Sequence, residues 1–276
     1  MTQPAWRQVN VAFPDWEHAE ATAVNELAPL LRTAEAVGAI TTWFIIRKVP
    51  CWRIRYIPVA GAQNPVDQRL DELISAGQLT GWTEITYEPE VHAFGGAQSM
   101  DAAHRFFHRD CRNLLDYLRG DAARHRRETS LMLFSLMMRA AGLDWYEQGD
   151  VWARVAAHRA LPPGSEQNSN DQLHTAVRRL LSVDPKYAVQ PGGPLAAATG
   201  WVSAYNDAGS DLARLNESGQ LHRGLRDVLA HHVIFAWNRL GLPYGTQATL
   251  TTAAKTVIFG PDPATERSNA DRVESP

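Results

Sequence analysis

The N-terminal third of the chain contains four short runs with the pattern of β-strands. Residues 6–13 alternate apolar and polar positions, which is typical of a strand with one buried face. Two further runs, residues 40–48 and 51–59, are separated only by Val49-Pro50, so they predict an antiparallel hairpin. A fourth strand is expected over residues 81–88.

Two helical stretches separate these strands. Residues 15–37 repeat apolar side chains at helical spacing, with Asp15 placed to cap the start and Gly38 to end the helix. A second helix begins near Asn64 and stops at Gly77. The resulting order is β-α-β-β-α-β, which is the arrangement of a ferredoxin-like sheet.

Helical periodicity dominates the rest of the chain. We expect helices over residues 100–118, 128–141, 149–158, 170–181, 194–216, 221–240 and 246–259. A turn-rich stretch at residues 162–169 interrupts them and predicts a loop or linker.

The sequence therefore predicts an α+β protein with a ferredoxin-like sheet followed by a helical bundle. A small α/β region covers residues 1–96, and a helical region over 97–260 packs on it, so that the two form one compact unit. The polar residues 261–276 are expected to be a disordered tail.

The composition of the chain mainly excludes certain classes of function. The 276 residues are 45% hydrophobic and 21% charged with a net charge of −3, which argues against a general binder of nucleic acid or membrane surfaces. No apolar run reaches the roughly 20 residues of a membrane span, and no signal-peptide core is seen, so we expect a cytoplasmic protein. Cys51 and Cys111 form no metal motif and are expected to stay reduced. Most of the nine tryptophans are expected in the core.

Three arginines on the predicted hairpin are the first candidate chemistry. Arg53 and Arg55 are two positions apart, so they share one face of their strand, and Arg47 on the neighbouring strand is a candidate for the same side. Such a set suits a carboxylate or phosphate, because the planar guanidinium donates paired hydrogen bonds. An exposed sheet face with solvated arginines and acidic neighbours is the alternative, and the spacing alone leaves both open.

The segment after the fourth strand carries Tyr87, Glu90, His92 and Gly95-Gly96. Glu90 and His92 are candidate proton-transfer groups, although an acid at a strand end is more often a surface residue or the partner of an arginine. The double glycine predicts a tight turn or a close backbone approach, and it is not part of a nucleotide-binding motif.

Histidines occur in two helical stretches. His104 and His108 have the spacing of metal ligands on one helix face, but Arg105 stands where zinc proteases have glutamate, so a solvated or core-edge face is favoured and no metal is predicted. The adjacent His231 and His232 point in different directions on a helix, so at most one faces a site.

One further polar pair follows an apolar helical run. Asn238 and Arg239 come directly after residues 233–237, near the end of the predicted helix. The pair either caps that helix or forms part of a pocket wall.

Several separated motifs together resemble one known family. They comprise residues 43–47, 52–55, 87–90, 94–96, 103–110, 142–146 and 231–241. These segments resemble the thiopeptide-type bacteriocin biosynthesis domain, the family that includes the C-terminal elimination domain of class I lantibiotic dehydratases. The resemblance covers about residues 6–259.

The resemblance implies work on a ribosomally made precursor peptide that carries a leader. In full-length dehydratases one domain glutamylates Ser or Thr from glutamyl-tRNA, and the domain like this one eliminates glutamate to give dehydroalanine or dehydrobutyrine. We therefore expect a lyase that is the split partner of a glutamylating dehydratase. The alternatives are a pyridine synthase, which joins two dehydroalanines in a formal [4+2] cycloaddition and releases the leader, and a non-catalytic leader-binding subunit.

The resemblance also implies a set of site residues. Candidate catalytic groups are Arg47, Arg55, Tyr87, His231 and His232, and candidate substrate contacts are Arg53, Glu90, His92, Asn238 and Arg239. No metal and no organic cofactor are expected, a homodimer is left open, and leader docking by strand addition at a sheet edge is expected.

The chain departs from the family pattern at three positions. Pro89 and Ala93 lie in the segment where elimination domains usually carry arginines, and Ala236 stands where relatives often have histidine. His231 or His232 is therefore a candidate for the missing base.

Overall fold

The alternating N-terminal runs form a four-stranded antiparallel sheet. The computed structural model describes residues 6–62, 64–161 and 171–260. Its strands are β1 (Arg7–Ala12), β2 (Ile40–Lys48), β3 (Cys51–Pro58) and β4 (Gly81–Ile85). Their order across the sheet is β2-β3-β1-β4, so the predicted ferredoxin-like sheet is confirmed.

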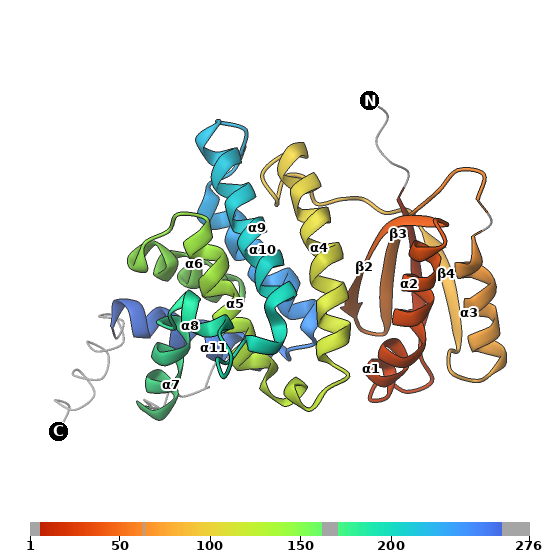
Figure 1. Ribbon diagram of the computed structural model, residues 1–276, viewed down its shortest axis with the longest axis horizontal. Coiled ribbons are helices and arrows are strands. Elements are labelled where there is room, and N and C mark those ends of the chain that lie inside the picture. The colour runs from red at the N-terminus through yellow and green to blue at the C-terminus, as the bar shows by residue number, and fades with distance from the viewer. Residues whose placement is uncertain (1–5, 63, 162–170, 261–276) are drawn as a thin grey trace, which may run out of the picture.

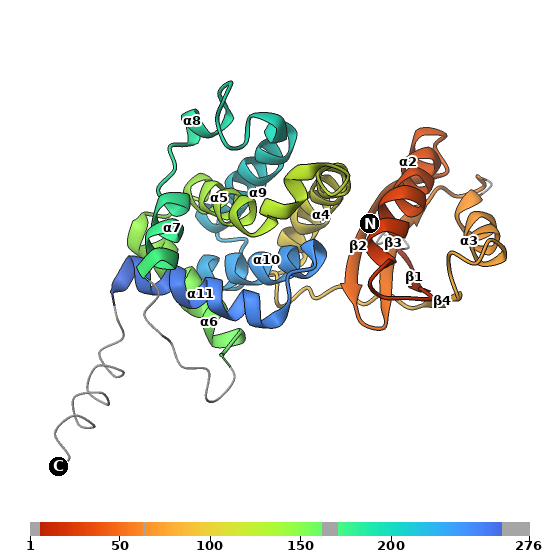
Figure 2. The same ribbon diagram turned by 90° about the horizontal axis from the view of Figure 1, so that it is seen from below.

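One sheet face is covered by the two predicted helical stretches (Figure 2). The first is a continuous helix made of α1 (Ala19–Thr22), a π-helical turn η1 (Ala23–Leu27) and α2 (Ala28–Ala36), and the second is α3 (Pro65–Ser75). Pro29 has no N–H to donate to the preceding turn, which explains why the helix widens just before it.

Of the two predicted helix caps, the one at Asn64 is present and the one at Asp15 is not. Asn64 caps α3 by accepting a hydrogen bond from the Val66 amide at 3.1 Å, as its position indicated. Asp15 was expected to cap the first helix, but it accepts from the Glu17 amide at 2.8 Å and so stabilises the turn before it. The helix therefore begins at Ala19.

Strand register decides which arginines share a face. Arg55 lies opposite Gln8 and Phe44, whereas Arg47 lies opposite Trp52. Directly paired residues point to the same side, and neighbours along a strand point to opposite sides. Arg47 therefore faces the helix-covered side and Arg53 and Arg55 face the other side. The shared face of Arg53 and Arg55 is confirmed, and Arg47, a candidate for the same side, does not join them.

The C-terminal part of the chain is helical, as predicted. Its elements are α4 (Ala97–Tyr117), η2 (Asp121–His125), α5 (Arg126–Ala140), α6 (Trp145–His158), α7 (Asp171–Leu181), α8 (Pro185–Val189), η3 (Ala196–Ala198), α9 (Thr199–Glu217), α10 (Leu225–Leu240) and α11 (Tyr244–Phe259). The predicted loop at 162–169 and tail at 261–276 lie outside the described residues. No described helix has the length and apolar character needed to cross a bilayer.

Two helix starts differ from the prediction for local reasons. Helix α6 begins four residues earlier than expected because Asp144 and Glu147 form a reciprocal capping box. Helix α10 begins at Leu225 rather than at residue 221, and residues 221–224 form a loop that contacts the linker between the sheet and α4.

Helix α4 joins the two parts of the molecule by lying along the edge strand β2 (Figures 1 and 2). The Ile45 amide donates to Cys111 Sγ at 3.3 Å, and His108 Nδ1 lies 2.9 Å from the Trp43 carbonyl oxygen. The backbone groups of this edge are therefore occupied by α4 side chains, which prevents another strand from pairing there. Strand β4 is the opposite edge of the sheet.

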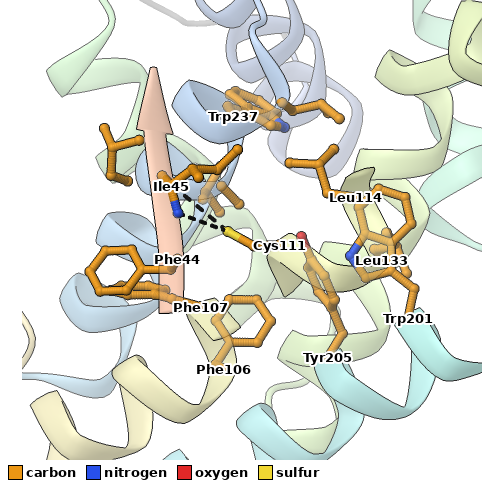
Figure 3. Close-up of a cluster of buried hydrophobic side chains, with 14 of the residues drawn as sticks. Phe44, Ile45, Phe106, Phe107, Cys111, Leu114, Leu133, Trp201, Tyr205 and Trp237 are labelled. Atoms are coloured by element: carbon orange, nitrogen blue, oxygen red, sulfur yellow. Dashed lines mark hydrogen bonds between the residues drawn. The ribbon is translucent and has the colours of Figure 1, made fainter. Parts of the chain in front are cut away.

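The tryptophans mainly fill the interior, in agreement with the prediction. The side chains that are at most 3% exposed are Trp43, Trp52, Trp152, Trp201 and Trp237. Both cysteines are free thiols. Phe106, Phe107 and Tyr205 lie around Cys111, and the Phe106 ring of α4 packs against Tyr205 of α9 with ring centres 4.9 Å apart (Figure 3).

Candidate functional site

The sheet face opposite α2 and α3 carries a buried arginine surrounded by polar and aromatic groups. Arg55 is 4% exposed, and its Nε donates to Gln8 Oε1 at 2.7 Å. Its guanidinium carbon lies 4.2 Å from the ring centre of Tyr87 and 5.3 Å from that of Phe44. The alternative of a solvated arginine is therefore wrong for Arg55.

Tyr87 and His104 form a hydrogen-bonded pair beside Arg55. The Tyr87 hydroxyl is 2.9 Å from His104 Nε2, and the Trp6 ring covers His104 with ring centres 4.6 Å apart. Burial, assisted by the charge of Arg55, lowers the pKa of His104 to about 4, and burial raises the pKa of Tyr87. At neutral pH the pair is therefore a phenol donating to a neutral imidazole.

Three buried polar atoms near this pair have no hydrogen-bond partner within the described part of the chain. They are Arg53 Nε, Arg55 Nη1 and Glu90 Oε2. Leaving such groups unpaired costs free energy, so they are suited to pairing with a bound molecule. The two guanidinium N–H groups fit a carboxylate, and the Glu90 oxygen fits an N–H donor. Arg53 and Asn10 are half-buried, so the polar face reaches solvent at that end.

The linker that supplies Tyr87 and Glu90 is held against the helical part. The Arg223 guanidinium donates to the Ala93 carbonyl at 3.0 Å, and the His222 amide donates to the Gly95 carbonyl at 2.7 Å. Gly95 and Gly96 both have positive φ, and a Cβ at Gly95 would lie 2.7 Å from Leu221 Cδ1. The double glycine is thus explained by a close approach as well as by a turn.

The two adjacent histidines of α10 have different surroundings. His232 is 2% exposed, lies 5.0 Å from the Phe94 ring and has no hydrogen-bond partner among the described residues, and burial lowers its pKa to about 3. A substrate cannot reach it without movement of the surrounding rings, so we leave it out of the proposed site. His231 is half-buried, with Nδ1 3.3 Å from Arg223 Nη1, and is the one that can face a site.

Arg47 lies in a separate groove at the junction of α1, β2 and the end of α10. Its side chain is 8% exposed, forms an ion pair with Glu20 and stacks on Trp52 with 4.4 Å to the ring centre. A Cβ at Gly241 would lie 2.6 Å from Arg47 Nη1. Arg126 and Arg47 lower the pKa of Glu20 to about 2 despite its burial. Arg47 Nε and Nη2 also have no hydrogen-bond partner among the described residues, but Glu20 neutralises the charge of Arg47, which weakens its case as an anion-binding group.

The remaining predicted residues fall in different places. Asn238 lines the groove of Arg47, which encloses about 500 Å³, and its Oδ1 accepts from Gln247 Nε2 at 3.3 Å. Arg239 is 0% exposed and donates to Asp110 at 2.7 Å, so it is a core ion pair and offers a substrate no surface. His92 is exposed on the linker.

Sequence reasoning missed several members of this cluster. The sequence placed His104 on a solvated or core-edge helix face rather than in a metal site, and it indicated no role for Gln8, Trp6 or Arg223. The alternation of β1 does carry a signal for Gln8, because it puts Gln8 and Asn10 on one face of a half-buried strand. Within the described residues, no group of three or more His, Cys, Asp or Glu side chains is arranged to hold a metal ion.

Comparison with known proteins gives one family and one fold. The family model described as lantibiotic biosynthesis dehydratase C-term matches residues 6–257. The structure is similar to the tRNA dependent lantibiotic dehydratase MibB from Microbispora sp. 107891, with a TM-score of 0.62 and 16% identity over 100% of this chain and 29% of MibB. It is similar to TsrL, with a TM-score of 0.63 and 17% identity over 94% of this chain and 99% of TsrL. No curated protein gives a significant match.

Proposed function

Because the chain belongs to the lantibiotic biosynthesis dehydratase C-terminal family, we propose that it matures a precursor peptide by eliminating glutamate from glutamylated Ser or Thr. In this reaction a base removes the α-proton, the electron pair forms the Cα–Cβ double bond, and the bond between Cβ and the ester oxygen breaks. The carboxyl group that formed the ester leaves as a carboxylate of free glutamate, and a dehydroamino acid remains in the peptide. The chemistry needs a cationic site for the leaving carboxylate and a group that moves a proton.

The observation that carries this proposal is the buried Arg55 beside the Tyr87–His104 pair. Arg55 and Arg53 have unpaired N–H groups on the same sheet face, which suits the carboxylate of the glutamyl group. Tyr87 is the candidate proton-transfer group, and its hydroxyl lies 2.9 Å from Nε2 of the neutral His104. The guanidinium 4.2 Å from the Tyr87 ring favours any negative charge that develops on the phenol.

The direct test uses the purified chain and a glutamylated precursor peptide. Loss of glutamate from the peptide, followed by mass spectrometry, is the expected result, and a sample without the protein is the control. A peptide that binds tightly but stays glutamylated would contradict the proposal and support the leader-binding subunit.

One observation favours the pyridine synthase as a second candidate. Residues 70–104 contain no lysine or arginine, so the linker itself provides no cation for a leaving glutamate. A cycloaddition that releases no glutamate has less need of such a cation. Ring formation with leader release from a dehydroalanine-bearing peptide, in place of glutamate loss, would favour this candidate.

Partners and place of action remain part of the proposal. This chain spans 29% of MibB, and we propose that glutamylation is carried out by a separate dehydratase. Leader docking by strand addition is proposed for β4, because α4 occupies the backbone groups of β2. A leaderless peptide should then bind more weakly, and equal affinity would exclude this mode. We propose action in the cytoplasm.

A further inference from the structure

A guanidinium from the helical part lies at the centre of the linker. Residues 70–104 contain no lysine or arginine, so any cation at this linker must come from elsewhere in the chain. Arg223, in the loop between α9 and α10, donates to the Ala93 carbonyl at 3.0 Å through Nη1. The same Nη1 lies 3.3 Å from His231 Nδ1. Arg223 thus joins the linker to the half-buried histidine of α10.

This contact favours one tautomer of His231. A guanidinium only donates hydrogen bonds, so its approach to Nδ1 is favourable when Nδ1 carries no proton. A neutral ring in that state carries its proton on Nε2. The Asp227 carbonyl oxygen, 3.4 Å from Nδ1, is a competing partner. A hydrogen bond to it requires a proton on Nδ1, and that N–H would then face the N–H groups of Arg223.

We propose that Arg223 is a positioning residue that holds His231 as the neutral tautomer protonated on Nε2, so that His231 donates a hydrogen bond to a carbonyl oxygen of the bound peptide. This inference rests on the proposed function and adds a second polar group, separate from the Arg55 cluster, to those proposed to contact the peptide. It also changes the expected role of His231 from a base to a donor. A neutral imidazole can stabilise the enolate-like charge that develops during α-proton removal.

His231 is connected to the first cluster through buried aromatic rings. The Phe94 ring lies 6.2 Å from His231 and 5.3 Å from Phe107, and Phe107 lies 6.3 Å from His104. These rings form a continuous aromatic strip between His104 and His231, and Phe94 and Phe107 are fully buried, so the strip is part of the core. Within the described residues, none of the hydrogen bonds of His231 uses Nε2. The strip therefore has the Tyr87–His104 pair at one end and a histidine with an available Nε2 at the other.

Burial and nearby positive charges keep His231 neutral near pH 7. Burial is the largest cause, and the charges of Arg223 and His158 add to it, so the pKa of His231 is lowered. The Asp227 carbonyl and the charge of its side chain act in the opposite direction and are outweighed. His158, on α6, has its ring centre 5.5 Å from that of His231.

The test measures the tautomer directly in the full chain. Nitrogen-15 chemical shifts of the histidine side chains, with His231 assigned by comparison with His231→Gln, should show a proton on Nε2 and none on Nδ1 at pH 7.5. In Arg223→Gln the proton should move toward Nδ1 and the pKa of His231 should rise. Arg223→Lys keeps a cationic donor and should retain the Nε2 proton. Circular dichroism checks that each variant is folded.

A neighbouring arginine provides the matched control. Arg226 lies three residues further along and pairs with Glu147 and Asp150, so Arg226→Gln should leave the His231 shifts unchanged. A proton on Nδ1 in the unmodified chain, or unchanged shifts in Arg223→Gln, would overturn the inference. These readouts do not depend on turnover. Expected shifts in a chain without glutamate elimination would therefore support the positioning role and contradict only the proposed function.

Discussion

At the scale of single residues, two buried arginines of the β2–β3 hairpin have different surroundings. Arg47 is paired with Glu20, whose charge Arg126 also neutralises, whereas Arg55 donates to a neutral amide, contacts aromatic rings and has the charge of Glu90 nearby. A guanidinium without a carboxylate partner retains its capacity to bind an anionic substrate. The two arginines are therefore expected to respond differently to substitution.

Substitution of Arg55 should reduce turnover more than stability. In Arg55→Gln the cation that receives the leaving carboxylate is lost, and kcat/KM for glutamate elimination should fall by about 10²-fold, the usual effect of removing one transition-state donor. Mass-spectrometric rates at several peptide concentrations measure the change. A variant that eliminates glutamate at the unmodified rate would remove Arg55 from the site.

Substitution of Arg47 should have the reverse effect. In Arg47→Gln a buried ion pair and a stacking contact with Trp52 are lost, and the free energy of unfolding should fall by about 2–3 kcal/mol. This is near the low end for a broken buried pair, because Arg126 still neutralises Glu20. Urea unfolding measures this loss, and turnover per folded molecule should persist. Loss of turnover with full stability would return Arg47 to the catalytic set.

The buried His104 makes stability depend on pH. Its pKa of about 4 in the folded chain lies below the ordinary value of 6.5, so the unfolded state binds more protons between these values. Its contribution is present above pH 6.5 and is lost as pH falls toward 4, on the order of 3 kcal/mol in total. The difference in the free energy of unfolding between pH 7 and pH 4.5 should therefore be smaller in His104→Gln than in the unmodified chain.

At the scale of elements, the linker between β4 and α4 depends on close contact with the loop at residues 221–224. The sequence indicated a turn or a close approach at Gly95-Gly96, and the structure has both. The partner of the approach could not be predicted, because the two segments are more than 120 residues apart and no local pattern relates them.

Two glycines with similar backbone angles allow the effect of the turn and the effect of the close approach to be measured separately. Gly95 has φ +85° and would place a Cβ 2.7 Å from Leu221, whereas Gly142 has φ +81° and nothing within 4 Å. Both alanine variants should lose about 1 kcal/mol from the left-handed backbone, and Gly95→Ala should lose a further ~1–2 kcal/mol from overpacking. Chemical unfolding of the two variants gives the difference, and equal losses would argue against the close contact.

At the scale of the whole molecule, the sheet region and the helical region share an aromatic interface. Phe44 of β2 lies 5.2 Å from Phe107 of α4, and Phe94 of the linker lies 5.0 Å from Phe235 of α10. The edge of β2 also uses α4 side chains as hydrogen-bond partners. We therefore expect the two regions to fold together.

Separation of the regions should test this dependence. A fragment of residues 1–96 would expose Phe44, Phe94 and the edge of β2, so we expect it to aggregate or to lack a dispersed NMR spectrum. The full chain should unfold in one transition when followed by both tryptophan fluorescence and far-ultraviolet circular dichroism. A soluble, well-folded fragment would show that the sheet region is an independent domain.

The sequence by itself determined the elements, their order and the polar face of the sheet. Hydrophobic periodicity and capping residues act over a few positions, so the ferredoxin-like order and the shared face of Arg53 and Arg55 could be predicted. Only the tertiary structure decided that Arg47 faces the other side, since this depends on the register between β2 and β3. It also decided that His104 meets Tyr87, because that contact depends on where α4 packs against the sheet.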